Sequence, residues 1–317
     1  MKIIPLNNNR INDLIDLWNK EFSKEFPMRR ELFIQNSFED ENVFLPGSWM
    51  AVDEDNHVIG FIISKRWQDP MPVPMPADVG WIQVLLVSKE ERNKGIGSLL
   101  LEKAEMALKA DGATEIQLGG DPLHYFPSVP AEYEKSSEWF EHRGYEYLGS
   151  EYDLLANYDS TAESEMPNLD GIEIEILTLK DKDEMLKFMN RVFPGRWEYE
   201  TIRYFQKGGT GREFVVLKKA GKIIGSCRIS DEHSSVIYNN VYWSPLFSEP
   251  LGGIGSVGID STERGNGYGL TAVLAGISIL RSRGINKIVI DWTTIVDFYG
   301  KMGYQIWKEY RKYRKQL

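Results

Sequence analysis

The spacing of hydrophobic and polar positions changes in the same order along the two halves of the chain. Short apolar or alternating runs predict strands, and apolar residues that recur every three to four positions predict helices. Such patterns predict a mixed α/β (α+β) fold in each half. The expected strands cover about 2–6, 48–66 and 79–88 in the first half, and 172–179, 213–230, 236–243 and 254–260 in the second; the expected helical regions are 10–40 and 181–206.

A glycine-rich hexapeptide occurs once in each half, between an apolar run and a helical pattern. Arg92-Asn93-Lys94-Gly95-Ile96-Gly97 and Arg264-Gly265-Asn266-Gly267-Tyr268-Gly269 are two copies of Arg-x-x-Gly-x-Gly, 172 positions apart (264 − 92). The helical pattern that follows has its apolar positions at Leu99, Leu100, Ala104 and Leu108 in one copy, and at Leu270, Val273, Leu274 and Ile277 in the other. Matched features at a fixed spacing indicate an internal repeat.

The repeat extends beyond the hexapeptide. Phe26-Pro27-Met28-Arg29 has a counterpart in Phe193-Pro194-Gly195-Arg196, and Trp139-Phe140 has one in Phe298-Tyr299. The offset falls from 172 to 159 (298 − 139) between the hexapeptide and the Trp-Phe pair. The first half therefore carries about 13 additional residues, and the ring-rich segment 119–127 is the expected insertion.

The repeat predicts two domains. A chain of 317 residues accommodates two domains that each bury a core. We expect an N-terminal domain at 1–158 and a C-terminal domain at 171–317. The segment 159–170 between them is acidic, small and turn-prone, which is typical of a linker.

Composition narrows the classes of function. The net charge of −10 argues against general nucleic-acid binding, which requires Lys and Arg to neutralise phosphates. Apolar runs are too short to span a membrane, and the first residues lack a signal-peptide pattern, so a cytoplasmic location is expected. The lone Cys227 is predicted to be a small buried hydrophobe. The four histidines are scattered and predict no metal site, and the basic run 308–315 is predicted to be an edge strand with a tail.

The hexapeptide has the features of an anion site. Unpaired N–H groups at a helix N-terminus and the positive end of the helix dipole attract phosphate, and glycine permits the backbone angles that such a turn requires. A simple helix-capping turn is the structural alternative. Gly253-Ile254-Gly255-Ser256-Val257-Gly258 also matches G-x-G-x-x-G. It leads into a strand-like run, however, and no Asp or Glu lies about 20 residues further on, so we do not expect a dinucleotide site there.

With Phe298-Tyr299-Gly300-Lys301-Met302-Gly303-Tyr304 after the second hexapeptide, the chain resembles the GNAT superfamily of N-acetyltransferases over both halves. The resemblance implies two tandem GNAT folds, each a splayed, twisted, mostly antiparallel sheet flanked by helices, and acetyl-CoA as the cofactor. It also implies where CoA binds. The pantetheine would lie along Leu85, Leu86 and Val87 or along Val257, Gly258 and Ile259, and the pyrophosphate on Arg92, Asn93, Lys94, Gly95, Ile96, Gly97 and Ser98 or on Arg264, Gly265, Asn266, Gly267, Tyr268, Gly269 and Leu270.

The resemblance also suggests which half is catalytic. The family tyrosine that protonates the departing thiolate corresponds to Tyr299, whereas the first half has Phe140, which has no proton to donate. We therefore expect the C-terminal half to be catalytic. Asp291, eight residues before Tyr299, is the candidate base or amine anchor, with a loop-solvating role as the alternative. Asp297 fits either a base or the N-cap of the last helix.

The acceptor is expected to be a small-molecule amine. Ring-rich, irregular segments at 193–199 and 239–243 suit a sugar, so an amino sugar such as glucosamine is favoured. Aminoglycoside, polyamine, amino-acid, thiol–sugar and protein or peptide acceptors remain open, as does a non-catalytic acyl-CoA-binding module. Both a homodimer and a monomer that acts as an internal pseudo-dimer are compatible with the repeat.

Overall fold

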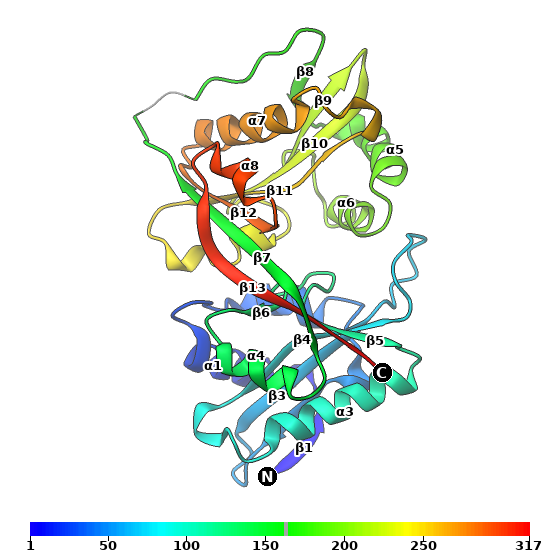
Figure 1. Cartoon of the computed structure of the whole chain (residues 1–317), viewed down its shortest axis with the longest axis vertical. Helices are drawn as coiled ribbons and strands as arrows, with labels where there is room; N and C mark the ends of the chain where they lie inside the picture. Colours follow the sequence, from blue (N-terminus) through cyan, green and yellow to red (C-terminus); the bar gives the residue numbers. More distant parts are fainter. Residues whose placement is uncertain (162–163) are drawn as a thin grey trace. The chain divides into compact units, whose positions relative to one another are not determined.

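The computed structural model describes residues 1–161 and 164–317, which form two compact units (Figure 1). The first unit comprises Met1–Pro70, Pro76–Tyr152 and Lys308–Leu317, and the second comprises Met71–Met75 and Asp153–Trp307. These units differ from the expected ranges, because the last ten residues pack in the first unit and a short proline-rich segment of the first half packs in the second. Residues 162 and 163 of the expected linker lie outside the described residues.

The first unit is a mostly antiparallel sheet with helices packed on it. Its strands occur in the order β1-β2-β3-β4-β5-β13-β7, and β4–β5 is a parallel pair. Helix α3 packs on β2, β3 and β4, and α1 packs on β3. The strands are β1 (Lys2–Pro5), β2 (Trp49–Val52), β3 (Val58–Arg66), β4 (Val79–Val87), β5 (Glu115–Leu118), β6 (Val129–Pro130), β7 (Glu146–Asn157) and β13 (Gln305–Gln316); the helices are α1 (Ile11–Phe22), α2 (Arg30–Phe33), α3 (Ile96–Ala110) and α4 (Glu134–Glu141). Strand β7 belongs to this unit up to Tyr152, and β13 from Lys308 onward.

The second unit repeats this plan. Its strands run in the order β7-β12-β11-β10-β9-β8, with β11–β12 as the parallel pair, and α7 packs on β9, β10 and β11. The strands are β8 (Glu173–Ile176), β9 (Phe214–Lys219), β10 (Lys222–Ser230), β11 (Leu251–Ile259) and β12 (Lys287–Thr293); the helices are α5 (Lys182–Val192), α6 (Arg196–Gln206), α7 (Tyr268–Ser282) and α8 (Val296–Gly300).

In each unit the parallel pair is short, so the two strands separate at matched positions. Strand β4 pairs with β5 only from Val79 to Ile82, and β11 pairs with β12 only from Leu251 to Ile254. The remainder of β4 and β11, which holds the predicted pantetheine positions, lies beyond the paired segment. This separation agrees with the splayed sheet that the family resemblance implies.

Two local expectations are wrong. Residues 308–315 are not an edge strand with a tail, because this part of β13 is flanked by β5 and β7, and Arg314 pairs with Gln117. The expected strand at 236–243 is instead irregular, with a single 3₁₀ turn at Asn239–Val241. Aromatic and β-branched residues suggested a strand there, but their side chains pack inward from turns: Tyr238, Tyr242 and Trp243 are buried.

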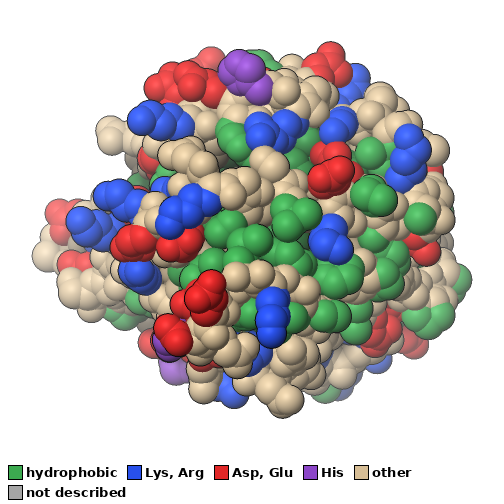
Figure 2. All heavy atoms as spheres, turned by 90° about the horizontal axis from the view of Figure 1, so that it is seen from below, with side chains coloured by type: hydrophobic (Ala, Val, Ile, Leu, Met, Phe, Trp, Pro, Cys, Tyr) green, Lys and Arg blue, Asp and Glu red, His purple; other side chains and the backbone are tan. Residues whose placement is uncertain are grey.

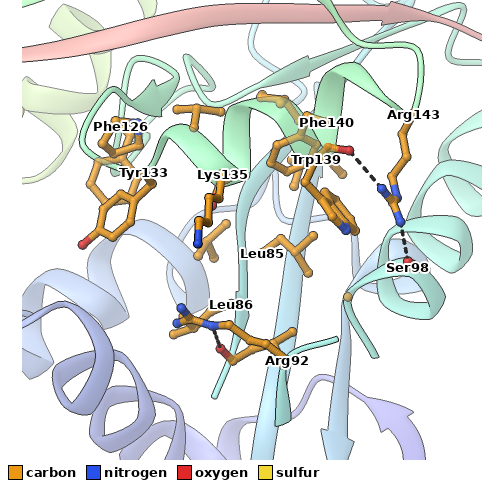
Figure 3. Close-up of a pocket in the computed structure, with 18 of the residues that line it drawn as sticks. Leu85, Leu86, Arg92, Ser98, Phe126, Tyr133, Lys135, Trp139, Phe140 and Arg143 are labelled. Atoms are coloured by element: carbon orange, nitrogen blue, oxygen red, sulfur yellow. Dashed lines mark hydrogen bonds between the residues drawn. The ribbon is translucent and has the colours of Figure 1, made fainter. Parts of the chain in front are cut away.

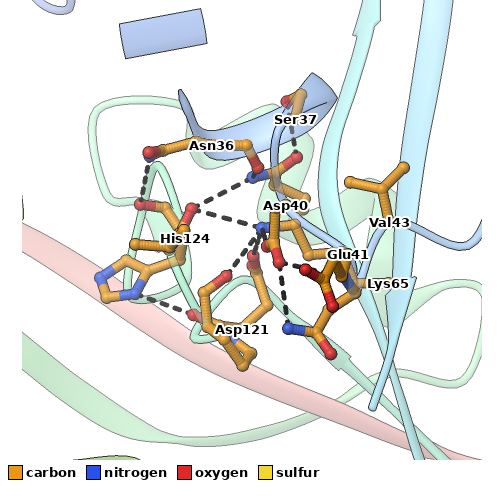
Figure 4. Close-up of polar contacts among 12 residues, drawn as sticks. Asn36, Ser37, Asp40, Glu41, Val43, Lys65, Asp121 and His124 are labelled. Atoms are coloured by element: carbon orange, nitrogen blue, oxygen red, sulfur yellow. Dashed lines mark hydrogen bonds and ion pairs between the residues drawn. The ribbon is translucent and has the colours of Figure 1, made fainter. Parts of the chain in front are cut away.

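The insertion at 119–127 is held by a buried ion cluster (Figure 4). Lys65 on β3 is fully buried, and its Nζ lies 2.7 Å from a carboxylate oxygen of Asp40 and 2.7 Å from one of Asp121. The same Nζ donates to the carbonyl of Pro122 at 2.7 Å. Buried charges require such partners. The ring of Tyr125 packs against Trp18, with 5.0 Å between their centroids, so the insertion is part of the first unit's interior.

The structure also places Cys227 and the apolar positions of α7. Cys227 is buried, as expected, and burial raises the pKa of its thiol to about 12. Leu270 and Leu274 of α7 are partly exposed, whereas Val273 and Ile277 enter the core.

On the face drawn in Figure 2, hydrophobic side chains gather near the centre and charges of both signs surround them. That face therefore offers no continuous cationic surface for a phosphate backbone.

Candidate acyl-CoA and acetyl-transfer site

The two hexapeptides fold into the same turn. In the first, Asn93 and Gly95 have positive φ angles of 63° and 83°; in the second, Gly265 and Gly267 have 86° and 79°. Gly95 and Gly267 are the N-caps of α3 and α7. Alternation of positive and negative φ turns successive N–H groups toward one concave side, which is the geometry of an anion-binding nest. The turn residues are largely exposed, as a ligand would require.

The motif arginine has a structural role that its charge alone did not predict. Arg92 Nε donates to the carbonyl of Val87 at 3.0 Å, and Arg264 Nε donates to the carbonyl of Ile259 at 3.2 Å. Each arginine thereby ties the turn to the end of the strand that precedes it. Arg92 also forms an ion pair with Glu21.

A pocket of about 800 Å³ lies in the first unit, along the predicted pantetheine strand (Figure 3). Its walls come from β4, the glycine turn, the start of α3 and the helix α4. Leu86 is buried, while Leu85 and Val87 are half-buried. The predicted residues Leu85, Leu86, Val87, Arg92, Asn93, Gly95, Gly97 and Ser98 line the pocket together with Tyr133, Lys135, Trp139, Phe140 and Arg143.

Arg143 is a cation of this pocket that the sequence did not single out. Its Nη2 donates to Ser98 Oγ at 2.8 Å, and its Nη1 donates to the carbonyl of Trp139 at 3.0 Å. The guanidinium also lies 3.7 Å from the centre of the Trp139 ring. These contacts fix a positive charge beside the anion-binding turn. The sequence feature that could have identified Arg143 is its position, three residues after the Phe that replaces the family tyrosine.

In the second unit, Tyr299 is buried in α8. Burial, followed by the charges of Cys227 and Asp291, raises the pKa of the Tyr299 phenol above its ordinary value. The phenol therefore stays protonated at neutral pH and is able to donate. The charge of Asp291, the other predicted catalytic residue, is thus among the groups that act on the Tyr299 phenol. Asp297 is exposed within the first turn of α8 and is not its N-cap, which is Ile295.

Asp291 is the first residue of β12 after the segment that pairs with β11. Its Oδ2 accepts from Asn239 Nδ2, and its Oδ1 accepts from Asn240 Nδ2 at 3.1 Å. Removal from water raises the pKa of Asp291 to about 6, against the opposing effect of Arg228. A carboxylate with a pKa close to neutrality is suited to accept a proton.

Asp291 is under the influence of an ion network in which Arg228 is buried and Arg196 and Glu200 are half-buried. Arg228 Nη1 on β10 lies 2.7 Å from Glu200, and Arg196 Nε lies 2.8 Å from the same carboxylate. Burial alone would raise the pKa of Glu200, but the two arginines lower it to about 2. Arg228 and Glu200 were not predicted as site residues. The sequence feature that could have identified this pair is an arginine within the otherwise apolar run of β10.

The predicted acceptor segments of the second unit pack near the cofactor strand. A Cβ on Gly258 would lie 2.4 Å from the Phe193 ring and 3.0 Å from Trp197, so Gly258 allows both rings to approach β11. Arg196 lies 4.6 Å from the centre of the Trp292 ring. In the pantetheine positions, Val257 is half-buried, and Gly258 and Ile259 are buried.

Two further observations concern membrane spans and metal ligands among the described residues. Within 1–161 and 164–317, no helix is long and apolar enough to cross a membrane. The group of potential metal ligands found in the same ranges is Asp53, Asp55 and His57, in the turn between β2 and β3. Exposed acidic clusters are common without an ion, and this group is distant in sequence from both glycine turns.

The geometry agrees with comparisons to known proteins. A sequence profile of the acetyltransferase (GNAT) family matches residues 11–129 and 182–304, so the chain belongs to this family and contains two copies of its domain. A mycothiol acetyltransferase of Nocardia farcinica is 26% identical over 245 residues, which span 73% of each chain. Matches to two further mycothiol acetyltransferases span 21% and 47% of those proteins, less than two thirds of their length.

Two solved structures share the fold of the whole chain. One is described as a GCN5-related glucosamine N-acetyltransferase region in a fungal multi-domain GH3 β-N-acetylglucosaminidase. It has a TM-score of 0.86 and 23% identity, and covers 99% of this chain and 38% of that one. The other is a tandem GNAT protein from the clavulanic acid biosynthesis pathway, with a TM-score of 0.70 and 14% identity, covering 99% and 98%. At these identities the likeness establishes the fold.

Proposed function

We propose that the protein is an acetyl-CoA-dependent N-acetyltransferase of small-molecule primary amines, with the second unit as its catalytic unit. The second unit contains both a buried, protonated Tyr299 and a carboxylate, Asp291, that two amides hold and whose pKa burial raises to about 6, and this combination supports the assignment. The amine attacks the thioester carbonyl, Asp291 anchors the amine or accepts its proton, and Tyr299 donates to the departing thiolate as general acid. The Arg264–Leu270 turn holds the CoA pyrophosphate.

The first unit is proposed to bind acyl-CoA without transferring its acyl group. Its pocket and the cations Arg92, Lys135 and Arg143 suit a phosphorylated ligand. Phe140, which replaces the tyrosine, has no proton to give.

Proton energetics favour an acceptor of low basicity. At pH 7, neutralising a lysine-like amine of pKa about 10.4 costs about 4.6 kcal/mol, whereas an α-amine of pKa about 8 requires about 1.4 kcal/mol. An amino sugar such as glucosamine is our first candidate. It is supported by the ring-rich segments beside β11 and by the name of the fungal relative. The relatives named mycothiol acetyltransferases favour a second candidate, the cysteine amine of a thiol–sugar conjugate.

The test is acetyl-CoA-dependent acetylation by the full chain of a panel comprising glucosamine, a cysteine-bearing thiol–sugar, an aminoglycoside, a polyamine and a lysine peptide. Released thiol and acetylated product are both measured. We expect the low-pKa amines to give the highest kcat/KM. A preference for the lysine peptide would overturn the small-amine assignment, and no turnover with tight acetyl-CoA binding would favour a non-catalytic binding module.

A further inference from the structure

Strand β11 contains glycines that neither the CoA site nor a dinucleotide motif accounts for. A Cβ on Gly253 would lie 2.2 Å from Cγ and Oδ1 of Asn240. A Cβ on Gly255 would lie 2.8 Å from Asp291 Oδ1 and 3.2 Å from Asn240 Nδ2. No Cβ is accommodated at such distances without movement, so the strand is shaped around the Asn240–Asp291 pair.

The orientation of the Asn240 amide is fixed by a third group. Ser230 Oγ, at the end of β10, donates to Asn240 Oδ1 at 2.5 Å. The amide oxygen therefore faces Ser230, and the amide nitrogen faces Asp291, to which it donates at 3.1 Å. An amide assignment inferred from hydrogen bonding is strongest when both ends are constrained in this way.

At the corresponding positions of the first unit, the glycine and the large side chain are exchanged between the two strands. In register, Ile82 pairs with Leu118 as Ile254 pairs with Ile290, so Gln83 corresponds to Gly255 and Gly119 to Asp291. The Gln83 side chain fills its site by donating to the Asn36 carbonyl at 2.9 Å and accepting from Ser37 at 3.0 Å. The carboxylate and the space for it thus occur together in the unit that also has the tyrosine.

We propose that Asn240 is a positioning residue that holds Asp291 in the orientation required for acetyl transfer, with Ser230 fixing its amide and Gly253 and Gly255 providing the space. This inference rests on the proposed role of Asp291. The carboxylate is held by neutral amides, whereas the nearby Arg228 is bonded to Glu200. A direct guanidinium partner would lower the basicity of a carboxylate strongly. Neutral donors orient Asp291 while leaving it able to accept a proton.

The experiment compares Asn240→Ala, Asp291→Asn and the double variant in the full chain. The charged or titratable groups that act on Asp291 are Arg228 on β10, Glu200 on α6 and Tyr299 on α8, and all three stay in place. Loss of a donor to the carboxylate destabilises its anion. In Asn240→Ala we therefore expect the Asp291 pKa, followed by carbon-13 NMR of its carboxyl group, to rise by about one unit. The acidic limb of kcat/KM should shift equally, with KM for acetyl-CoA unchanged.

Non-additivity is the second readout, because the double variant should be no slower than Asp291→Asn. Asn286→Ala is the matched control: its amide lies before the other end of β12, where it accepts from Arg281, and its profile should equal wild type. If Asn240→Ala does not fold, Ser230→Ala should give a smaller shift in the same direction. An unchanged Asp291 pKa and pH profile in a folded Asn240 or Ser230 variant would overturn the inference. If Asp291→Asn itself keeps the wild-type profile, the proposed role of Asp291 fails, and this inference with it.

Discussion

In the proposed mechanism, Tyr299 would donate a proton against an energetic gradient. An ordinary phenol has a pKa of about 10 and an ordinary thiol about 8.5, so complete transfer to a free thiolate costs about 2 kcal/mol. Burial raises the Tyr299 pKa further and increases that cost. In the proposed mechanism, Tyr299 would therefore act chiefly through a hydrogen bond that strengthens as charge develops on sulfur. A protonated, desolvated donor is suited to this task because it requires no reorganisation by water.

A residue-scale prediction concerns Lys65. Lys65→Met removes the cation and leaves Asp40 and Asp121 as buried, uncompensated carboxylates. Breaking a buried ion pair in this way costs about 3–5 kcal/mol. We expect urea unfolding of the full chain to show that loss in the free energy of unfolding of the first unit. Lys20→Met, which removes the exposed pair with Glu90, is the control and should cost less than about 1 kcal/mol. Equal stability of the two variants would contradict the role assigned to the cluster.

At the scale of single residues, the sequence named as candidates the side chains that belong to a motif. The family resemblance and the fixed spacing of the motifs made Tyr299 and the two turns candidates. The groups near Asp291 come from separate elements: its amide partners Asn239 and Asn240 precede β11, and the ion pair of Arg228 and Glu200 joins β10 with α6. Nothing in the local sequence specifies that such residues meet. Lys65 likewise gave no signal, because its carboxylate partners lie in distant loops.

At the scale of elements, the glycine turn and the helix after it form a unit whose conformation depends on positive φ. Gly95→Val and Gly267→Val place a β-branched residue where φ is +83° and +79°. Each substitution should distort one turn and turn its N–H groups away from the phosphate. We expect calorimetric titration with acetyl-CoA to show two sites in wild type and about a tenfold or greater loss of affinity at one site in each variant.

Glycines at the opposite ends of the same helices are matched controls for backbone strain. Gly112 and Gly284 have φ values of +90° and +81°, and a Cβ added at either position would meet no atom within 4 Å. Gly112→Val and Gly284→Val should therefore lose stability without losing a binding site. If the turn variants bind acetyl-CoA as tightly as these controls, the turns are helix caps and not phosphate sites.

The order of elements was predictable because hydrophobic periodicity, and the Gly and Pro residues that interrupt it, are local properties of the sequence. The failure at 236–243 has a physical cause: aromatic residues favour strands, but Tyr242 and Trp243 bury their rings from short turns. The basic run 308–315 was expected to be an edge strand with a tail. It is instead flanked by β5 and β7, where its lysines and arginines pair with acids such as Glu105 and Glu146.

At the scale of the whole molecule, the repeat established two similar domains, and the family profile matches both. Their exact composition was not predictable from the repeat. Residues 308–317 follow the last motif of the second copy but pack in the first unit, and 71–75 pack in the second. These exchanges depend on long-range pairing, such as Lys315 with Ile116, which leaves no periodic signal in the sequence.

The central claim is that the second unit performs the chemistry and that Tyr299 assists the departing thiolate. The measurement that tests it most directly is steady-state acetylation of the best acceptor by Tyr299→Phe, beside wild type and Phe140→Tyr, with acetyl-CoA binding measured in parallel. Loss of a positioned acid should lower kcat of Tyr299→Phe by about 10²–10⁴-fold, with acetyl-CoA affinity unchanged and Phe140→Tyr equal to wild type. Full turnover by Tyr299→Phe at saturating substrate would contradict the claim.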